Sequence, residues 1–184
     1  MTPLNVLVIL GSVRRGRMSE RVAKFVMSRL TSVDGLRAEL IDLRELDLPI
    51  MEERLGRIEP TPPHVAELGA KIERADALII VSPEYNHGYP GVLKNALDYF
   101  YAQYKRTPVA LVTVSNGGHG GVNAWAQLVT VFAQLGAIVL PQTVAVSKVD
   151  QAFAEDGTPL EPSYIKRTDG MIAELVWLAT RLKA

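Results

Sequence analysis

The chain has 184 residues, of which 48% are hydrophobic and 22% charged, the proportions of a globular protein. Twenty basic residues balance twenty acidic ones, which excludes a general electrostatic attraction to nucleic acid or to an anionic membrane. The absence of cysteine excludes disulfides, thiolate metal sites and cysteine nucleophiles. No apolar segment approaches the roughly 18 residues of a membrane span, and the start lacks a secretory signal. We therefore expect a soluble, cytoplasmic protein with a single domain over residues 1–184.

The first apolar run predicts a buried strand that leads directly into an anion site. Residues 6–10 carry no polar side chain, which is typical of a strand covered on both faces of a parallel sheet. Gly11 ends this run, and a helical period begins near residue 19. Unpaired amides at a helix N-terminus attract phosphate. Four side chains at this turn could complete a phosphate site: Ser12, Arg14, Arg17 and Ser19. The alternative is a solvated basic turn with Ser19 as an ordinary N-cap.

Two better-known phosphate loops do not fit this segment. Arg17 stands where a nucleoside triphosphatase loop has its lysine, and Met18 stands where that loop has a magnesium-ligating hydroxyl. The dinucleotide fingerprint also fails, because four residues separate Gly11 from Gly16 and the middle glycine is absent. Side chains rather than bare backbone would hold the anion, which suits one terminal phosphate monoester.

The next segments predict an edge strand, a loop and a helix. Residues 36–43 alternate between apolar and polar, as in a half-exposed strand near a sheet edge. Asp42 ends this strand where a dinucleotide fold places a ribose-binding acid, but without the glycine fingerprint this role is not favoured. The charged stretch from Arg44 to Glu59 is long enough for a loop that crosses the mouth of the site. Pro62 and Pro63 then open a helix.

Two further apolar runs predict buried strands, and each ends in a loop marked by glycine or proline. Residues 77–81 lead into the loop 82–91, and residues 109–114 lead into the glycine-rich loop 115–121. A helix with apolar positions from Val92 to Tyr104 lies between them. In a parallel sheet, these loops and the loop after residue 10 open on the same side.

The end of the chain predicts a helix over 122–135, an edge strand over 137–146 and a closing helix around 171–182. The edge position follows from Pro141, which lacks the N–H that a central strand needs. Five strands alternating with helices indicate an α/β, doubly wound, five-stranded parallel sheet of flavodoxin-like order 2-1-3-4-5, with helices on both faces. The loops after the first and third strands then face each other across one crevice.

Three segments resemble the NAD(P)H-dependent FMN reductase family of flavodoxin-like quinone and azo reductases. They are residues 11–14 with Arg17, residues 83–86 with 90–98, and the glycine loop 117–121. The resemblance spans most of the chain from Val6 to about Val146, and the middle segment is the most specific of the three.

The resemblance implies a site for FMN. It implies that Ser12, Arg14 and Arg17, with Ser19 less certain, hold the FMN phosphate. It places the flavin ring against Pro83, Glu84, Tyr85 and Asn86. The pyrimidine side of the ring would be bordered by Ser115, Gly117, Gly118, His119, Gly120 and Gly121. Glycines let backbone N–H groups approach the ring where charge accumulates on reduction.

The implied activity is an FMN-containing oxidoreductase that passes hydride from NADPH or NADH, through FMN, to a quinone, an azo compound or free flavin by a ping-pong mechanism. The chemistry belongs to the cofactor, so we name no catalytic proton-transfer residue. The three histidines suggest no metal site. The alternatives are a flavodoxin-type electron carrier, which the neutral charge and the arginine loop disfavour, and a non-enzymatic redox or nucleotide sensor.

Surplus apolar surface predicts a homodimer or a dimer of dimers. Four aromatic residues follow the loop 82–91 within one predicted helix: Tyr99, Phe100, Tyr101 and Tyr104. The helix over 122–135 is apolar on more than one face around Trp125. The alternative is that these aromatic side chains pack on the sheet of their own chain. The other partners we expect are NAD(P)H and a small electron acceptor.

Overall fold

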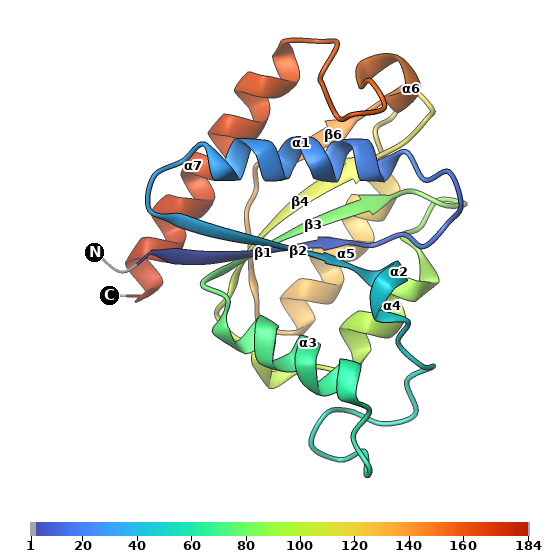
Figure 1. Ribbon diagram of the computed structural model, residues 1–184, viewed down its shortest axis with the longest axis vertical. Coiled ribbons are helices and arrows are strands. Elements are labelled where there is room, and N and C mark those ends of the chain that lie inside the picture. The colour runs from blue at the N-terminus through green and yellow to red at the C-terminus, as the bar shows by residue number, and fades with distance from the viewer. Residues whose placement is uncertain (1–2, 184) are drawn as a thin grey trace.

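A computed structural model describes residues 3–183 and contains one parallel sheet (Figure 1). Its strands are β1 (Leu4–Leu10), β2 (Leu36–Asp42), β3 (Ala77–Pro83), β4 (Pro108–Val114), β5 (Ile138–Val139) and β6 (Val144–Val146). They follow the order β2-β1-β3-β4-β5, and β6 also pairs with β4. Every pairing is parallel. The predicted fold class and strand order are therefore confirmed.

Helices cover both faces of this sheet, because alternate residues of each buried strand supply two separate cores. On one face, Val6 and Val8 pack with α1 (Ser19–Thr31) and α7 (Ser163–Lys183). On the other face, Leu7 and Ile9 join the core formed with three helices: α3 (Pro63–Arg74), α4 (Gly91–Asp98) and α5 (Val122–Gln134). Figure 1 shows these two helical layers above and below the sheet.

The last predicted strand is divided in two, which corrects the continuous strand expected over 137–146. Pro141 lies between β5 and β6, where its missing N–H interrupts the ladder. The hydroxyl of Thr143 donates a hydrogen bond of 2.7 Å to the carbonyl of Leu111. A side-chain hydroxyl thus satisfies a backbone carbonyl of β4 at the gap between the two short strands.

The helix expected from Val92 to Tyr104 ends earlier, at Asp98, and a short 3₁₀ helix η1 (Ala102–Tyr104) follows. The carbonyl of Tyr99 accepts a hydrogen bond of 2.8 Å from the amide of Leu55, so a distant loop takes the acceptor that a longer helix would use. Tyr99, Phe100 and Tyr104 point into the core and are at most 1% exposed. Packing within the chain therefore accounts for three of the four aromatic residues that suggested an interface.

The segment after the short helix α2 (Leu43–Leu46) does not cross the mouth of the site as expected. It docks on α4 instead. The side-chain amide of Asn95 accepts from the amide of Met51 at 2.8 Å and donates to the carbonyl of Pro49 at 2.8 Å. The hydroxyl of Tyr99 donates to the same carbonyl at 3.0 Å. Figure 1 shows this segment beside α3 and α4, below the sheet.

Candidate functional site

Three loops meet at the carboxyl ends of β1, β3 and β4, as the parallel topology requires. They enclose a cavity of about 270 Å³. Its lining consists of residues 14–19 from the first loop, 83–85 from the second, 114–116 from the third, and Val149. The sequence prediction that these loops share one crevice is therefore confirmed.

The first two loops are in direct contact because β1 and β3 are neighbours in the sheet, with Leu10 opposite Val81. Ser12 is fully buried, and its hydroxyl lies 2.6 Å from the hydroxyl of Tyr85. A Cβ atom at Gly11 would lie 2.8 Å from Cδ2 of Leu93 in α4, so the end of β1 packs closely against that side chain. These contacts hold the start of the first loop close to α4 and to the second loop.

The hydroxyl of Ser19 is buried and has no hydrogen-bond partner among residues 3–183. Ser19 is the first residue of α1 and lines the cavity. The residue before it, Met18, provides no side-chain cap for the helix. An unpartnered buried hydroxyl at a helix N-terminus is a donor available to an anion, because water or ligand must satisfy it. Ser19 does not act as the N-cap that the alternative interpretation required.

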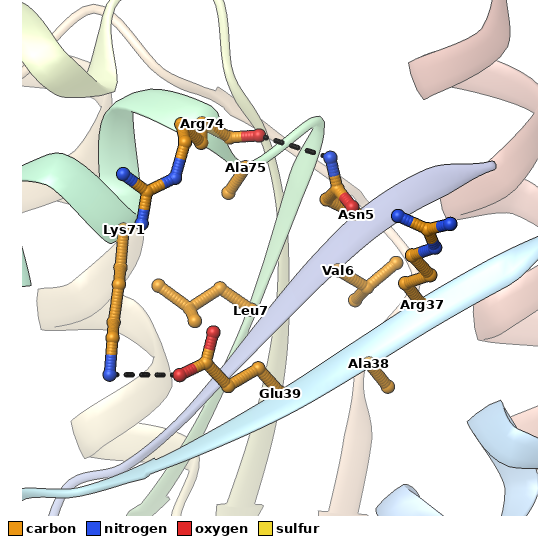
Figure 2. Close-up of a pocket in the computed structure, with 9 residues that line it drawn as sticks. All are labelled: Asn5, Val6, Leu7, Arg37, Ala38, Glu39, Lys71, Arg74 and Ala75. Atoms are coloured by element: carbon orange, nitrogen blue, oxygen red, sulfur yellow. Dashed lines mark hydrogen bonds and ion pairs between the residues drawn. The ribbon is translucent and has the colours of Figure 1, made fainter. Parts of the chain in front are cut away.

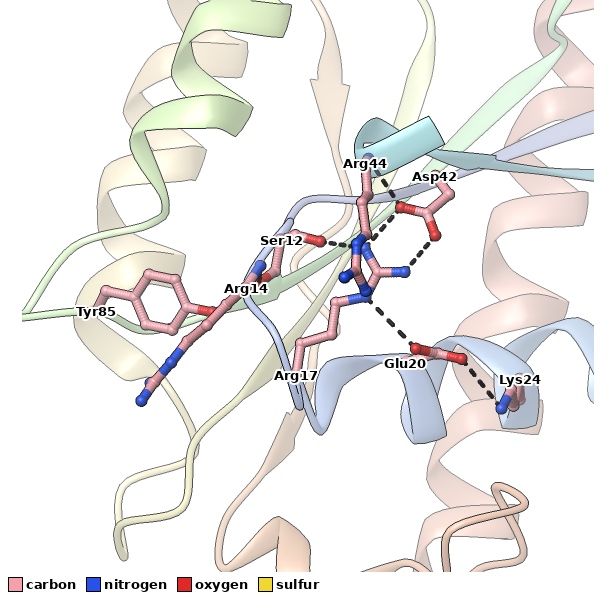
Figure 3. Close-up of polar contacts among 8 residues, drawn as sticks. All are labelled: Ser12, Arg14, Arg17, Glu20, Lys24, Asp42, Arg44 and Tyr85. Carbon is pink, nitrogen blue, oxygen red and sulfur yellow. Dashed lines mark hydrogen bonds and ion pairs between the residues drawn. The ribbon is translucent and has the colours of Figure 1, made fainter. Parts of the chain in front are cut away.

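The arginines of the first loop differ in their surroundings (Figure 3). Arg14 is exposed, and its guanidinium carbon lies 5.7 Å from the centre of the Tyr85 ring. Arg15 is exposed as well. Neither forms an ion pair with a carboxylate of the described chain. By contrast, the Arg17 side chain is 5% exposed and pairs with Asp42. The unpaired positive charge at the cavity therefore comes from Arg14 and Arg15.

Arg17 bridges three elements instead of pointing into open solvent. Its Nη1 atom donates to the carbonyl of Ser12 at 2.5 Å and to Oδ1 of Asp42 at 2.7 Å, and its Nη2 atom donates to Oδ2 of Asp42. The Nε atom lies 3.5 Å from Glu20. Burial opposes the charge, but the contacts with Asp42 outweigh it and raise the pKa of Arg17, so the guanidinium stays ionised.

The second loop is held by the first turn of α5. The Glu84 carboxylate accepts hydrogen bonds from the amides of Asn123 at 2.9 Å and Ala124 at 3.1 Å, and from the side chain of Asn123 at 3.0 Å. Burial opposes ionisation of Glu84, but these hydrogen bonds prevail and lower its pKa. Carboxylates are favoured at a helix N-terminus, where amides are unpaired. Glu84 thus fixes the loop to α5, a role that sequence reasoning missed.

A tight turn completes the second loop. Tyr85 and Gly88 exchange two backbone hydrogen bonds, of 2.7 and 3.0 Å. Asn86 and His87 between them both have positive φ, of 50° and 63°, as in the turns that close short hairpins. The carbonyl of His87 also accepts a hydrogen bond of 2.8 Å from Gln127 of α5. Asn86 and His87 are exposed, and neither lines the cavity.

The third loop presents its first residues to the cavity and its last residues to the sheet. Ser115 lines the cavity, together with Asn116, which the sequence analysis did not select. Residues 117–119 are exposed and lie outside the lining. Gly120 and Gly121 are buried with φ of 62° and 81°, and side chains there would lie 2.9 Å from Ala145 and from Thr113. These two glycines are explained by close packing.

Several cavity residues were not predicted, and their sequence signals differ. Asn116 directly follows Ser115 after a buried strand, so its position was a usable signal. Val149 lines the cavity from α6 (Val149–Ala152), far along the chain, and carries no local signal. The remaining unpredicted lining residues are Arg15, Gly16, Met18 and Val114.

A larger groove, of about 360 Å³, lies at the amino ends of β1 and β2 (Figure 2). Its residues include Lys71, whose ammonium group already contacts Glu39 at 2.8 Å and Glu67 at 2.7 Å. No buried side-chain atom without a hydrogen-bond partner belongs to its lining residues. The cavity at the carboxyl ends is therefore the candidate site despite its smaller volume.

Two other kinds of site receive no support within residues 3–183. No group of three or more histidine, aspartate or glutamate side chains there is arranged to hold a metal ion. None of the helices in the same range combines the length and apolarity that a membrane crossing requires.

Comparisons with known proteins identify the family. The family model for NADPH-dependent FMN reductase matches residues 4–151. An NAD(P)H-dependent FMN reductase of Schizosaccharomyces pombe is 36% identical over 80% of this chain and 74% of its own. An NADPH azoreductase of Bacillus sp. is 31% identical over 89% of both chains. A quinone reductase of Escherichia coli is 32% identical over 83% of this chain and 84% of its own.

A solved structure supports the same relationship. The flavoenzyme NAD(P)H:(acceptor) oxidoreductase FerB of Paracoccus denitrificans superposes with a TM-score of 0.82. It covers 97% of this chain and 98% of its own, at 26% sequence identity. With a matching family model over most of the chain, the protein belongs to the NADPH-dependent FMN reductase family.

Proposed function

We propose that the protein is an FMN-containing oxidoreductase that takes reducing equivalents from NADPH or NADH and passes them to a quinone, an azo compound or free flavin. The observation that carries this proposal is the buried, unpartnered hydroxyl of Ser19 in a cavity beside Arg14. A hydroxyl donor, an unpaired guanidinium and a helix N-terminus together suit a phosphate monoester.

The phosphate of FMN would be held by the first loop. Arg14 and Ser19 line the cavity at the start of α1 and supply one guanidinium and one hydroxyl. Ser12 would add a second hydroxyl, although it is fully buried and is not among the lining residues. The Ser12 hydroxyl contacts Tyr85 and would exchange or share that contact on binding. Arg17 belongs to the same loop, although Asp42 already occupies most of its donors. The donor set therefore fits the phosphate end of the cofactor.

The flavin ring would lie against residues 83–86, with Ser115 and the loop 117–121 at its pyrimidine side. The contacts of Glu84 with α5 support this placement, because they fix the backbone that the ring would rest on. Residues 117–119 are exposed, and the amide of Gly117 donates to the hydroxyl of Ser115 at 2.9 Å, which holds this loop beside the cavity. When bound, FMN supplies the hydride chemistry, and the chain supplies position and hydrogen bonds.

Neither Glu84 nor His119 is proposed as a proton-transfer group. Both carboxylate oxygens of Glu84 accept hydrogen bonds from α5, and these bonds favour the ionised form. His119 is exposed and does not line the cavity. Glu84 therefore shapes the site by fixing the second loop to α5, and His119 is given no part in proton transfer.

A ping-pong mechanism is proposed because the three loops line a single cavity. The electron donor and the electron acceptor would therefore occupy the same space beside the flavin in turn. Initial rates at several fixed acceptor concentrations would then give parallel double-reciprocal lines. Intersecting lines would show that both substrates bind together and would reject the single-slot mechanism.

The names of the relatives support the classes of acceptor, since they include an FMN reductase, an azoreductase and a quinone reductase. The direct test is to purify the protein, record the flavin absorbance, and follow NADPH oxidation with menadione, an azo dye or FMN and no other protein present. A flavodoxin-type electron carrier or a redox sensor would carry flavin without rapid NADPH consumption. Such a result would overturn the proposed reaction.

A homodimer or a dimer of dimers is proposed as the active form. Its support rests on the exposed Tyr101 after α4, the exposed Val122 at the start of α5, and the half-buried Trp125 one turn further along α5. Both helices begin at loops that border the cavity, so pairing through this layer would bring a second chain close to the site. A cytoplasmic location is proposed from the absence of cysteine and the use of NAD(P)H.

A further inference from the structure

We propose that Arg17 is a positioning residue that does not itself bind the phosphate. Through Asp42 it fixes the shape of the first loop, which follows β1 and would hold the phosphate. This inference rests on the proposed binding of FMN. It concerns a fork of hydrogen bonds between the guanidinium of Arg17 and the carboxylate of Asp42, which Figure 3 shows beside the loop.

The first support is that three of the five N–H donors of Arg17 are already used. Nη1 donates to both Oδ1 of Asp42 and the carbonyl of Ser12, and Nη2 donates to Oδ2 of Asp42. The Nε atom is buried, has no hydrogen bond within the described chain and faces Glu20 at 3.5 Å. Arg17 lines the cavity, but its side chain is only 5% exposed and carboxylates lie on both sides of it. A phosphate would have to displace Asp42 from the Nη atoms or Glu20 from Nε to reach this guanidinium.

The second support is that the positive charge of Arg17 is neutralised by nearby carboxylates, whereas the positive charge of Arg14 is not. Asp42 neutralises Arg17 at hydrogen-bond distance, and Glu20 lies on its other side. The guanidinium carbon of Arg14 lies 5.7 Å from the centre of the Tyr85 ring, and this side chain pairs with no carboxylate among residues 3–183. The guanidinium available to neutralise a phosphate is therefore that of Arg14.

The third support is that the contacts of Arg17 and Asp42 join the segments that define the loop. Asp42 ends β2 opposite Leu10, the last residue of β1, so its carboxylate reaches the loop that follows β1. It also accepts from the amide of Arg44 at 2.9 Å, which ties it to α2. The hydrogen bond from Arg17 to the carbonyl of Ser12 then joins the end of the first loop to its start. A planar fork can make these contacts at once, and a lysine cannot.

The test compares FMN with riboflavin, which lacks the phosphate. Both are titrated into the flavin-free full-length protein, and flavin fluorescence gives the dissociation constants. The ratio of the riboflavin constant to the FMN constant measures the preference for phosphate. A variant that only destabilises the fold weakens both ligands and leaves this ratio unchanged.

Four variants separate positioning from binding. Asp42→Asn keeps the shape of the side chain but removes the charge, and we expect the ratio to fall about tenfold. Arg17→Lys keeps the charge but loses the fork, and we expect a similar fall. The double variant Arg17→Ala with Asp42→Asn is expected to be no worse than Arg17→Ala alone, because the two residues act as one unit.

The matched control is the ion pair between Arg29 and Asp169, which joins α1 to α7 at 2.8 and 2.9 Å outside the cavity. Asp169→Asn should leave the ratio unchanged. The proposal is overturned if Asp42→Asn binds FMN as well as or better than the original protein, since a freed Arg17 would then be a ligand. It is also overturned if Arg17→Lys retains the full ratio. Failure of the unaltered protein to bind either flavin would instead overturn the proposed function.

Discussion

The hydroxyl groups of Ser12 and Tyr85 lie 2.6 Å apart and join the loop after β1 to the loop after β3. These strands are neighbours at the point where the strand order reverses, so two segments separated by 73 positions in the chain form one wall of the cavity. Each of these hydroxyls is the partner of the other before a phosphate arrives. The contact therefore predicts that substitution of Tyr85 and substitution of Ser12 affect FMN binding differently.

We expect Tyr85→Phe to lower the stability of the flavin-free protein by about 1 kcal/mol, the net value of a typical hydrogen bond. FMN binding should change little, because loss of Tyr85 frees the Ser12 hydroxyl for the phosphate. Ser12→Ala should instead weaken FMN binding. Urea denaturation and fluorescence titration measure the two quantities. Equal losses of FMN affinity in both variants would contradict the assignment of Ser12 to the phosphate.

Ser19→Ala should stabilise the flavin-free protein and weaken FMN binding. The buried hydroxyl lacks a partner, and alanine is a better helix former, so removal relieves a cost of about 1 kcal/mol. At this chain length, the melting temperature would rise by about 2–4 °C. The bound phosphate would lose one donor. A rise in melting temperature with unchanged FMN affinity would show that Ser19 does not bind the phosphate.

The control for this change is Thr168→Val in α7. The hydroxyl of Thr168 is also buried and unpartnered within residues 3–183, but it does not line the cavity. Its removal should leave FMN affinity as it was. The comparison separates the effect of a hydroxyl that lines the cavity from the general effect of removing any buried polar group.

Arg14→Ala should weaken FMN binding about tenfold or more, because it removes the charge-assisted contact that the cavity offers to a phosphate. The expected loss falls as salt is added, since the guanidinium is exposed before binding. Arg44→Ala serves as the control, because this exposed arginine adds charge nearby without lining the cavity. Equal effects of the two substitutions would indicate a general charge effect and not a contact.

The parts of the fold that the sequence predicted are those where local pattern and tertiary packing agree. Val8 and Ile79 lie in apolar runs and are fully buried in neighbouring strands. The end of α4 could not be predicted, because it depends on a hydrogen bond from Leu55 to Tyr99 across 44 positions of the chain. The helical period of the sequence continues through Phe100. The helix ends earlier because the carbonyl of Tyr99 accepts a hydrogen bond from Leu55 in a distant loop.

The same distinction applies to the site. The place of Ser19 follows from a strand, a turn and a helix start, all visible in the sequence. The pairing of Arg17 with Asp42 depends on the register of β1 against β2 and on the direction of two side chains. Sequence position predicted a phosphate contact for Arg17, and it did not favour a ribose-binding role for Asp42. It could not indicate that the two residues would bind each other.

Glu84→Gln should reduce stability at neutral pH by about 1–2 kcal/mol, because a carboxylate that accepts three hydrogen bonds loses its charge. The pKa of Glu84 is lowered on folding, so its contribution is present above the unfolded pKa of about 4.3 and is lost as pH falls through the lower folded pKa. The difference between the original protein and the variant should therefore shrink in acid. Denaturation curves at pH 7 and below pH 4 would show it, and a difference that grows in acid would contradict the role of the charge.

If the protein assembles through the layer of α4 and α5, a charge on that layer should separate the subunits. Tyr101 follows α4, is 45% exposed and lies over Arg54, with 5.0 Å between the guanidinium carbon and the ring centre. Tyr101→Lys would bury an ammonium group at an apolar contact beside Arg54, where it has no opposite charge to pair with, and an unpaired buried charge is costly. Trp177→Lys is the matched control, because Trp177 is also an exposed aromatic residue beside an arginine but belongs to α7, which covers the opposite face of the sheet. Light scattering at micromolar concentration should give twice or four times the 20.2 kDa chain mass for the original protein and the control, and a lower mass for Tyr101→Lys. An original protein that is monomeric and fully active would reject the proposed assembly, and a Tyr101→Lys variant with unchanged mass would place the interface elsewhere.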